Sequence, residues 1–368
     1  MFFSPCQGLY RIAMLSLLSA VASGCTDLRY LVHVAHGQAQ LVTQRRPLDD
    51  VIAAPTTDAQ LAARLRLAKQ AREFATRQLH LPDNRSYTRY VDLHRPYVVW
   101  NVFATPRYSI EPVQHCFPIV GCVAYRGYFN EDLANAEGAR LRARGDDAFV
   151  GGVTAYSTLG WFADPLLSSM LRRDDDDLAG TMFHELAHQL IYVKNDTAFN
   201  ESFATFVQRE GLREWRITRS LPEGDDLDRQ RDNEFIRLVL DLRERLRTLY
   251  ASLADTAAME KDKPREFENF RERYRQWRDA NATDARGNVD HSRDAFVAAP
   301  LNNAMLLPFG LYDQWVPAFA AIFREAAGDW AKFYACVRAL VRERKVQREA
   351  TLKEYVELPV LSNNPIRP

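Results

Sequence analysis

The sequence predicts a predominantly helical α+β protein with a small sheet in the first half of the chain. Aromatic and β-branched runs, broken by Pro, Gly and Asn, lie between Tyr87 and Ser157 and predict strands there. Apolar residues at helical spacing fill most of the chain before and after this region. With 368 residues, 47% hydrophobic and 26% charged, the chain is long enough to bury a large core in one or two domains.

The N-terminal residues have the pattern of an export signal. Arg11 precedes an apolar run from residue 12 to residue 21, too short for a comfortable membrane span, which ends in Ala22-Ser23-Gly24-Cys25. Small residues directly before a Cys are typical of a bacterial lipobox, so residues 1–24 are predicted to be a signal peptide and Cys25 the lipidated residue. An ordinary cleaved signal is the alternative, because Ala22 stands where Leu is usual. We therefore expect a periplasm-facing lipoprotein of the cell envelope, and Thr26 favours the outer membrane.

Export also affects the interpretation of the cysteines. Cys116 and Cys122 lie close together around Pro118 and Gly121, and an oxidising periplasm favours a disulfide between them. A Cys/His metal site with the neighbouring histidine at 115 is the alternative, although no further ligand lies nearby. Cys336 lies in an apolar run and is predicted to be a buried free thiol.

Helical spacing predicts an N-terminal helical segment over residues 25–85. Apolar residues recur from Leu28 to Val42, a short helix covers residues 48–53, and a third runs from Ala59 to about Leu79.

The strands that follow are expected to form a small mixed or antiparallel sheet. They are predicted at residues 90–93, 97–103, 123–129 and 148–157, with a polar helix over 131–144. Residues 158–165 are rich in turn formers and predict a link into the next helix.

That next helix carries the run His184-Glu185-Leu186-Ala187-His188. Its two histidines are four residues apart, so on a helix both imidazoles project from one face and can take two tetrahedral positions around Zn²⁺. Glu185 can then take a proton from a zinc-bound water. Apolar neighbours and the acidic residues 174–177 before the helix favour this interpretation over a surface helix that happens to carry two histidines. The H-E-x-x-H pattern is typical of zinc metallopeptidases, and a sheet directly before it matches the zincin arrangement.

Glu201 is the predicted third ligand. It follows His188 by thirteen residues, which is enough for one helix to end and a second to return. A capping carboxylate in the first helical turn is the alternative role for Glu201, and Asp196 is a weaker candidate ligand. A third histidine is excluded, because none follows His188 until His291. Three protein ligands leave the fourth position for water, as a catalytic zinc requires.

The remaining chain, residues 221–358, is predicted to be helical. Residues 225–278 are dense in Arg and Glu with apolar residues in helical register, which predicts a long hairpin with solvated faces. Further helices are expected from Leu301 to about Leu352, followed by a tail over 359–368. Because 48 basic and 48 acidic residues cancel, nothing indicates a nucleic-acid partner.

Several runs outside the zinc motif together resemble a bacterial family known as putative aminopeptidases, which are predicted zinc peptidases often made as lipoproteins. The resemblance covers roughly Tyr30 to Tyr355. It rests on the runs at 116–122 and 125–129, at 155–162 with Asp164-Pro165, at 183–189, and on Asp196-Thr197 with Phe199-Asn200-Glu201-Ser202-Phe203-Ala204. It implies a gluzincin-like site with one Zn²⁺ bound by His184, His188 and Glu201, and Glu185 as the base. The zincin-like catalytic core would then span residues 86–220.

The expected function is a zinc-dependent peptidase, specifically an aminopeptidase, that hydrolyses peptides in the cell envelope. Tyr156, Tyr192 and Tyr312 are candidates to stabilise the oxyanion, and their spacing does not choose among them. An aminopeptidase also needs an acidic group for the free α-ammonium of its substrate, for which Asp164 and Asp196 are candidates. Two alternatives stay open: an envelope endopeptidase or amidase with the same metal centre, and a non-catalytic lipoprotein that zinc only stabilises.

Overall fold

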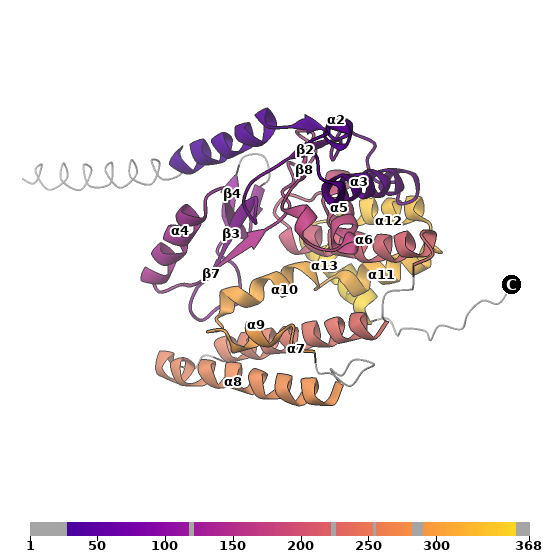
Figure 1. The fold of residues 1–368 in the computed structure, drawn as a ribbon. Coiled ribbons are helices and arrows are strands. Elements are labelled where there is room, and N and C mark those ends of the chain that lie inside the picture. Colours follow the sequence, from indigo (N-terminus) through magenta and orange to yellow (C-terminus); the bar gives the residue numbers. More distant parts are fainter. Residues whose placement is uncertain (1–27, 118–120, 222–225, 253–254, 282–289, 358–368) are drawn as a thin grey trace, which may run out of the picture.

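The computed structural model describes residues 28–117, 121–221, 226–252, 255–281 and 290–357. Its fold is α+β and predominantly helical, as the sequence predicts, with short strands gathered before the helix that carries the two histidines (Figure 1). The predicted signal peptide, Cys25 and the tail over 359–368 lie outside the described residues. Across the described ranges, no helix combines the length and the apolar character that crossing a bilayer requires.

The N-terminal segment is helical as predicted. A helix over residues 28–43 is followed by α2 (Leu48–Ala53) and α3 (Ala59–Arg77). The side chain of Asp58 caps α3 by accepting a hydrogen bond from the backbone N–H of Leu61. α3 buries Leu65, Ala68, Ala71 and Phe74 in the main core, which also contains α5 (Asp175–Leu190) and α6 (Thr197–Thr218).

The strands form three small sheets, so the prediction of a single sheet is wrong. β3 (Val99–Thr105) lies between β6 (Tyr125–Tyr128) and β7 (Asp147–Val153), both antiparallel to it. β2 (Arg89–Val91) pairs antiparallel with β1 (Arg46–Pro47) and parallel with β8 (Leu166–Leu167). β4 (His115–Phe117) and β5 (Gly121–Val123) form a hairpin that the predicted Cys116–Cys122 disulfide closes. The strand predicted to reach residue 157 ends at Val153, because Ser157 and Thr158 bond to Asp164 instead.

The two faces of β3 have different neighbours, because its side chains alternate. Trp100, Val102 and Ala104 pack with α4 (Glu131–Ala143), which covers one face of the sheet. Phe103 packs with α10 (Leu307–Tyr312) on the other face, where Val99 and Asn101 line a cavity. This second face therefore forms a wall of the site described below.

The main core contains α3 together with helices that follow the sheets. α5 (Asp175–Leu190) packs against α6 (Thr197–Thr218), and α10 (Leu307–Tyr312), α11 (Val316–Glu325), α12 (Trp330–Arg342) and α13 (Lys345–Glu357) follow later in the chain. The predicted hairpin is α7 (Asp226–Ala251) and α8 (Thr256–Asn281), which lies along the lower edge of Figure 1 with α9 (Asp294–Ala298). Short 3₁₀ turns cover Met170–Arg172 and Asn303–Leu306.

Cys336 is a free cysteine but is exposed, so its predicted burial is wrong. The inward face of α12 carries Phe333, Tyr334 and Val337, and Cys336 falls on the opposite face.

Candidate metal centre

α5 places His184 and His188 one turn apart on a buried face. Its N-terminus is capped by Asp174, whose side chain accepts a hydrogen bond from the backbone N–H of Asp177. The acidic residues of its first turn stabilise the helix by interacting with the positive end of its dipole. Both imidazoles are 8% exposed, although the helix begins at the surface. A buried pair of imidazoles needs polar partners, and α6 supplies one.

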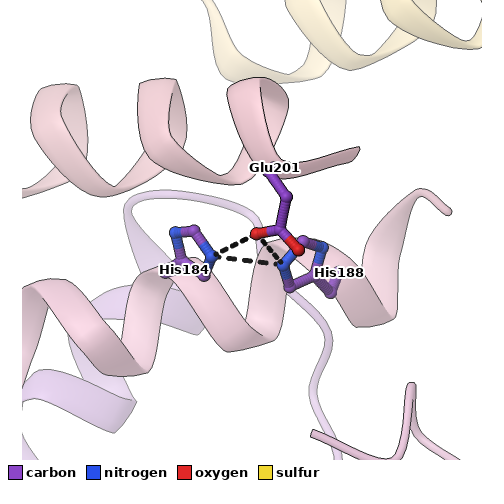
Figure 2. A group of neighbouring side chains, drawn as sticks. All are labelled: His184, His188 and Glu201. Carbon is purple, nitrogen blue, oxygen red and sulfur yellow. Dashed lines mark hydrogen bonds and ion pairs between the residues drawn. The ribbon is translucent and has the colours of Figure 1, made fainter. Parts of the chain in front are cut away.

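Glu201 reaches the two histidines from α6, as Figure 2 shows. The link between the helices turns at Asn195, which adopts a left-handed backbone conformation with φ 64°. Asn200 holds this link in place: its side chain accepts from the N–H of Val193 and donates to the carbonyl of Val193, each at 2.8 Å. The next residue along α6 then projects its carboxylate towards α5.

The three side chains bring three potential ligand atoms together. Nε2 of His184 and Nε2 of His188 are 3.2 Å apart, and Oε2 of Glu201 lies 3.4 Å and 3.5 Å from them. Three ligands of a tetrahedral ion with bonds of about 2.0–2.1 Å are separated by about 3.3–3.4 Å. All three residues are buried, and together they form a group able to hold a metal ion.

The donor chemistry fits a cation. Within the described residues, Oε2 of Glu201 is buried without a hydrogen-bond partner. A carboxylate oxygen and two imidazole lone pairs in such close contact repel one another unless a proton or a metal ion lies among them. Of the sequence-predicted ligands, the structure thus brings His184, His188 and Glu201 together.

The two glutamates of the site have oppositely shifted pKa values. Burial raises the pKa of Glu201, but the two neighbouring histidines outweigh burial and hold it below the ordinary value. Burial raises the pKa of Glu185 to about 7; His184 opposes this rise, while Glu201 and Asp164 add to it. One carboxylate therefore favours its charged form, and the other is able to carry a proton near neutrality.

Gln208 is a site residue that the sequence interpretation missed. Its Oε1 lies 3.1 Å from Nδ1 of His184, so this nitrogen donates and Nε2 keeps its lone pair for a metal. Gly180 of α5 leaves room for this contact, because a Cβ there would lie 3.2 Å from Cγ of Gln208. Gln208 follows Glu201 by seven residues on α6, and this two-turn spacing is the signal that could have found it.

Tyr125 of β6 was also missed as a site residue. Its hydroxyl donates a hydrogen bond to Oε1 of Glu201 at 3.3 Å, which leaves Oε2 facing the histidines. Burial and the charge of Glu201 raise its pKa far above the ordinary value, so Tyr125 keeps its proton and remains a donor.

The three predicted tyrosines all line the cavity but lie differently. The ring of Tyr312 stacks on that of His184, with centroids 5.9 Å apart. Burial raises the pKa of Tyr192 to about 12, and the charge of Glu201 adds to this rise. The pKa of Tyr156 is raised to about 12 by burial and then by Asp164 and Tyr30. Tyr312 thus contacts a candidate ligand directly, and Tyr192 lies where the charge of Glu201 acts on its hydroxyl.

Neither predicted aspartate is among the residues that line the cavity. The Asp164 carboxylate accepts hydrogen bonds from Thr158, Ser157 and the Gln189 amide, and thereby closes the turn over residues 157–164. Asp196 caps α6 through the N–H of Phe199 and forms a buried ion pair with Arg348 at 2.6 Å. Their carboxylates are used by the fold, which argues against roles in substrate or metal binding.

A cavity of about 1180 Å³ opens onto the ligand atoms. His184, Glu185, His188 and Glu201 lie in its wall, together with residues of β3 and β6 and of the helix over residues 28–43. Glu185 is partly exposed to it. The cavity exceeds the range of about 300–1,000 Å³ typical of small-molecule pockets, so it has room for several residues of a peptide.

The family described as "Putative aminopeptidase" matches residues 29–352 of this chain. The chain belongs to this family. No curated protein and no solved structure gives a significant match. Family membership supports a peptidase-type function in general terms, and the family match spans the helix over residues 28–43 as well as α5 and α6.

Each residue of the run from Asn200 to Ser202 has a different structural role. Asn200 fixes the link before α6, and Glu201 supplies the carboxylate of the site. The hydroxyl of Ser202 donates to the carbonyl of Leu311 and accepts from the N–H of Trp315, each at 3.1 Å, which ties α6 to the end of α10. Tyr312 is thereby held next to His184.

Proposed function

We propose that this protein is a zinc-dependent peptidase in which His184, His188 and Glu201 bind one Zn²⁺ and Glu185 acts as general base. The observation that carries the proposal is the triangle of buried ligand atoms, 3.2–3.5 Å on each side, in the wall of a peptide-sized cavity. Two imidazoles and one carboxylate are a frequent ligand set for catalytic zinc, and they leave one position open. The zincin-like character of residues 86–220 is part of this proposal.

When bound, Zn²⁺ supplies a Lewis acid that acidifies the attacking water and polarises the scissile carbonyl. Glu185 follows the first ligand on α5 and accepts the proton of that water, then returns it to the leaving amine. Its raised pKa suits a group that must both take and release a proton near neutrality. Gln208 keeps His184 in the tautomer that binds metal through Nε2.

A tyrosine hydroxyl is the proposed oxyanion donor. Tyr312 is the first candidate because its ring stacks on His184 and its pKa lies far above the ordinary value, so that it stays protonated. Tyr192 is the second, since it lines the same cavity and the charge of Glu201 acts on its hydroxyl. Replacing the correct tyrosine with Phe should lower kcat by about 10²–10³-fold while leaving zinc content unchanged.

We further propose that the mature chain works in the bacterial cell envelope, anchored by lipid at Cys25 on a periplasm-facing membrane surface. The apolar run over residues 12–21 and the small residues before Cys25 support export. The Cys116–Cys122 disulfide also suits an oxidising compartment. Metabolic labelling with a fatty acid, compared between the natural chain and Cys25→Ser, tests the anchor: absence of label from the natural chain would contradict it.

Glu185→Gln tests the catalytic proposal most simply. The variant should bind zinc as the natural chain does and lose peptide hydrolysis. Glu354→Gln, the same substitution at an exposed position of α13, serves as the control and should keep full activity. Loss of hydrolysis with retained zinc also distinguishes this proposal from a lipoprotein that zinc only stabilises.

A further inference from the structure

The carboxylates of the cavity are few. Among the described residues that line it, only Glu185 and Glu201 carry a carboxylate, and the proposed function uses both. Asp164 and Asp196 are occupied within the fold, as their hydrogen bonds show. The cavity therefore offers no remaining acidic side chain for a substrate.

A free α-ammonium group brought into such a cavity would lack a counter-charge. Burying a charge without a partner is unfavourable, and an aminopeptidase site normally pairs the ammonium with a carboxylate. The remaining charged side chain of the described lining is Arg173, which would repel an ammonium group. With a bound divalent ion, the two glutamates are neutralised, so the cavity gains no net negative charge.

The roof of the cavity comes from the N-terminal helix and is mostly apolar, although Gln38 also lies in it. Leu31, Val34 and Val42 of the helix over residues 28–43 lie in the cavity wall. They recur at helical spacing, so one face of this helix is turned towards the cavity. A second apolar group lies at the cavity wall in the segment between β7 and β8, where Trp161 and Phe162 are 68% and 51% exposed.

The helix is fixed to the sheet by specific contacts. The hydroxyl of Tyr30 donates to the carbonyl of Gly127 at 3.0 Å, and the N–H of Phe129 donates to Nε2 of His33 at 3.0 Å. Gly37 allows the close approach, because a Cβ at this position would lie 2.3 Å from the ring of Phe129. The apolar roof is therefore a built part of the cavity.

We propose that this cavity binds apolar stretches of polypeptide and does not require a free amino terminus. The proposal rests on the peptidase function argued above and specifies its substrate class. Because no further carboxylate of the described lining is available to pair with an α-ammonium group, we expect cleavage within a chain and of peptides with a blocked N-terminus. Preference for side chains such as Leu and Phe follows from the roof that Leu31, Val34 and Val42 form.

A matched set of peptides tests both parts. One Leu- and Phe-rich sequence is prepared with a free and with an acetylated N-terminus, beside a Lys- and Glu-rich sequence of equal length. Cleavage by the zinc-loaded chain is followed by mass spectrometry. Binding of the same peptides, labelled at the C-terminus, to the Glu185→Gln variant is measured by fluorescence anisotropy.

We expect the free and acetylated apolar peptides to be cut with kcat/KM values within about threefold of each other, and the charged peptide at least about tenfold more slowly. Val34→Asp places a charge in the roof and should reduce binding and cleavage of the apolar peptides about tenfold. Val32→Asp is the control on the same helix: Val32 is 61% exposed and not part of the cavity wall, so this variant should behave like the natural chain.

Three outcomes separate the claims. Cleavage of only the free peptide, with a preference approaching about 10⁴-fold, would overturn the inference and leave the zinc peptidase standing. Equal cleavage of the apolar and charged peptides would overturn the apolar preference. If no peptide is cut, the proposed function fails, and the anisotropy measurement then decides the inference. Equal binding of the free and acetylated apolar peptides would support the inference. Tight binding of only the free-amine form would contradict it.

Discussion

Nδ1 of His184 lies 3.1 Å from the side-chain oxygen Oε1 of Gln208, two helical turns beyond Glu201 on α6. One helix thus provides both a carboxylate of the metal site and the group that orients a histidine of the other helix. Because the imidazole donates through Nδ1, its Nε2 faces His188 and Glu201 with a free lone pair. The proposed metal centre therefore depends on Gln208, a residue that is not itself a ligand.

Gln208→Leu should weaken zinc binding without removing any ligand. Loss of a residue that orients a metal-binding histidine typically costs about 10–100-fold in metal affinity. Competition with a chromophoric chelator measures the affinity. Gln230→Leu, at an exposed position of α7, is the control and should leave it unchanged; an unaltered affinity in Gln208→Leu would remove Gln208 from the account.

Arg348→Met should destabilise the fold and leave zinc stoichiometry intact. The substitution leaves the Asp196 carboxylate buried without its partner, which costs about 3–5 kcal/mol in the free energy of unfolding. Lys345→Met on the same helix removes only an exposed 3.8 Å ion pair and should change stability by less than about 1 kcal/mol. Urea unfolding and metal analysis check both variants. Loss of zinc from folded Arg348→Met would contradict this prediction and indicate that Asp196 is a metal ligand.

The metal-free protein should lose stability as the pH rises through the titration range of Glu185. The pKa of this carboxyl is raised from 4.5 to about 7, so the folded state holds a proton that the unfolded state releases between these values. Ionisation of Glu185 therefore lowers the free energy of unfolding progressively from pH 4.5. The full loss, at most about 3 kcal/mol, is reached only above pH 7.

Glu185→Gln removes this titration. The difference in the free energy of unfolding between the metal-free variant and the metal-free natural chain should grow in favour of the variant from pH 4.5 to pH 7. Denaturant unfolding in the presence of a chelator measures it. A difference that stays constant across this range would show that Glu185 titrates normally.

Asn200→Ala should loosen the link between α5 and α6. The side chain of Asn200 is 2% exposed and makes two hydrogen bonds to the backbone of Val193. Their loss leaves buried backbone groups unpaired and should cost about 1–3 kcal/mol of stability. Because this link positions the Glu201 carboxylate beside the histidines, zinc affinity should fall as well. Asn130→Ala is the control: it removes only the cap of α4 and should lower stability without changing zinc affinity.

Much of the site could be predicted because its spacing is local. His184 and His188 are one turn apart on a helix that the sequence marks by its acidic start, and Glu201 follows in the next helix. Gln208 has the same kind of spacing but carries no motif of its own. Tyr125 could not be found, since only the pairing of β6 with β3 brings it to Glu201, and such non-local contacts leave no periodic signal.

The errors in the predicted fold also arise from contacts between residues that are far apart in sequence. The four predicted strands were located to within a few residues, whereas the short strands β1, β4 and β8 were not predicted. The division into three sheets depends on pairings such as Tyr90 with Leu166, which are far apart in sequence. Asp164 was a candidate for substrate binding because an aminopeptidase needs an acidic group for the free α-ammonium of its substrate. Its actual partners, Thr158 and Gln189, become evident only once the turn and α5 are placed together.

The central claim is that His184, His188 and Glu201 hold a catalytic zinc beside Glu185. Metal analysis of the purified chain, paired with peptide hydrolysis by the same sample, tests it most directly when the natural chain is compared with Glu201→Gln and Glu185→Gln. The account predicts one zinc per natural chain, loss of zinc in Glu201→Gln, and one zinc without hydrolysis in Glu185→Gln. Full zinc occupancy in Glu201→Gln, or full hydrolysis by Glu185→Gln, would contradict it.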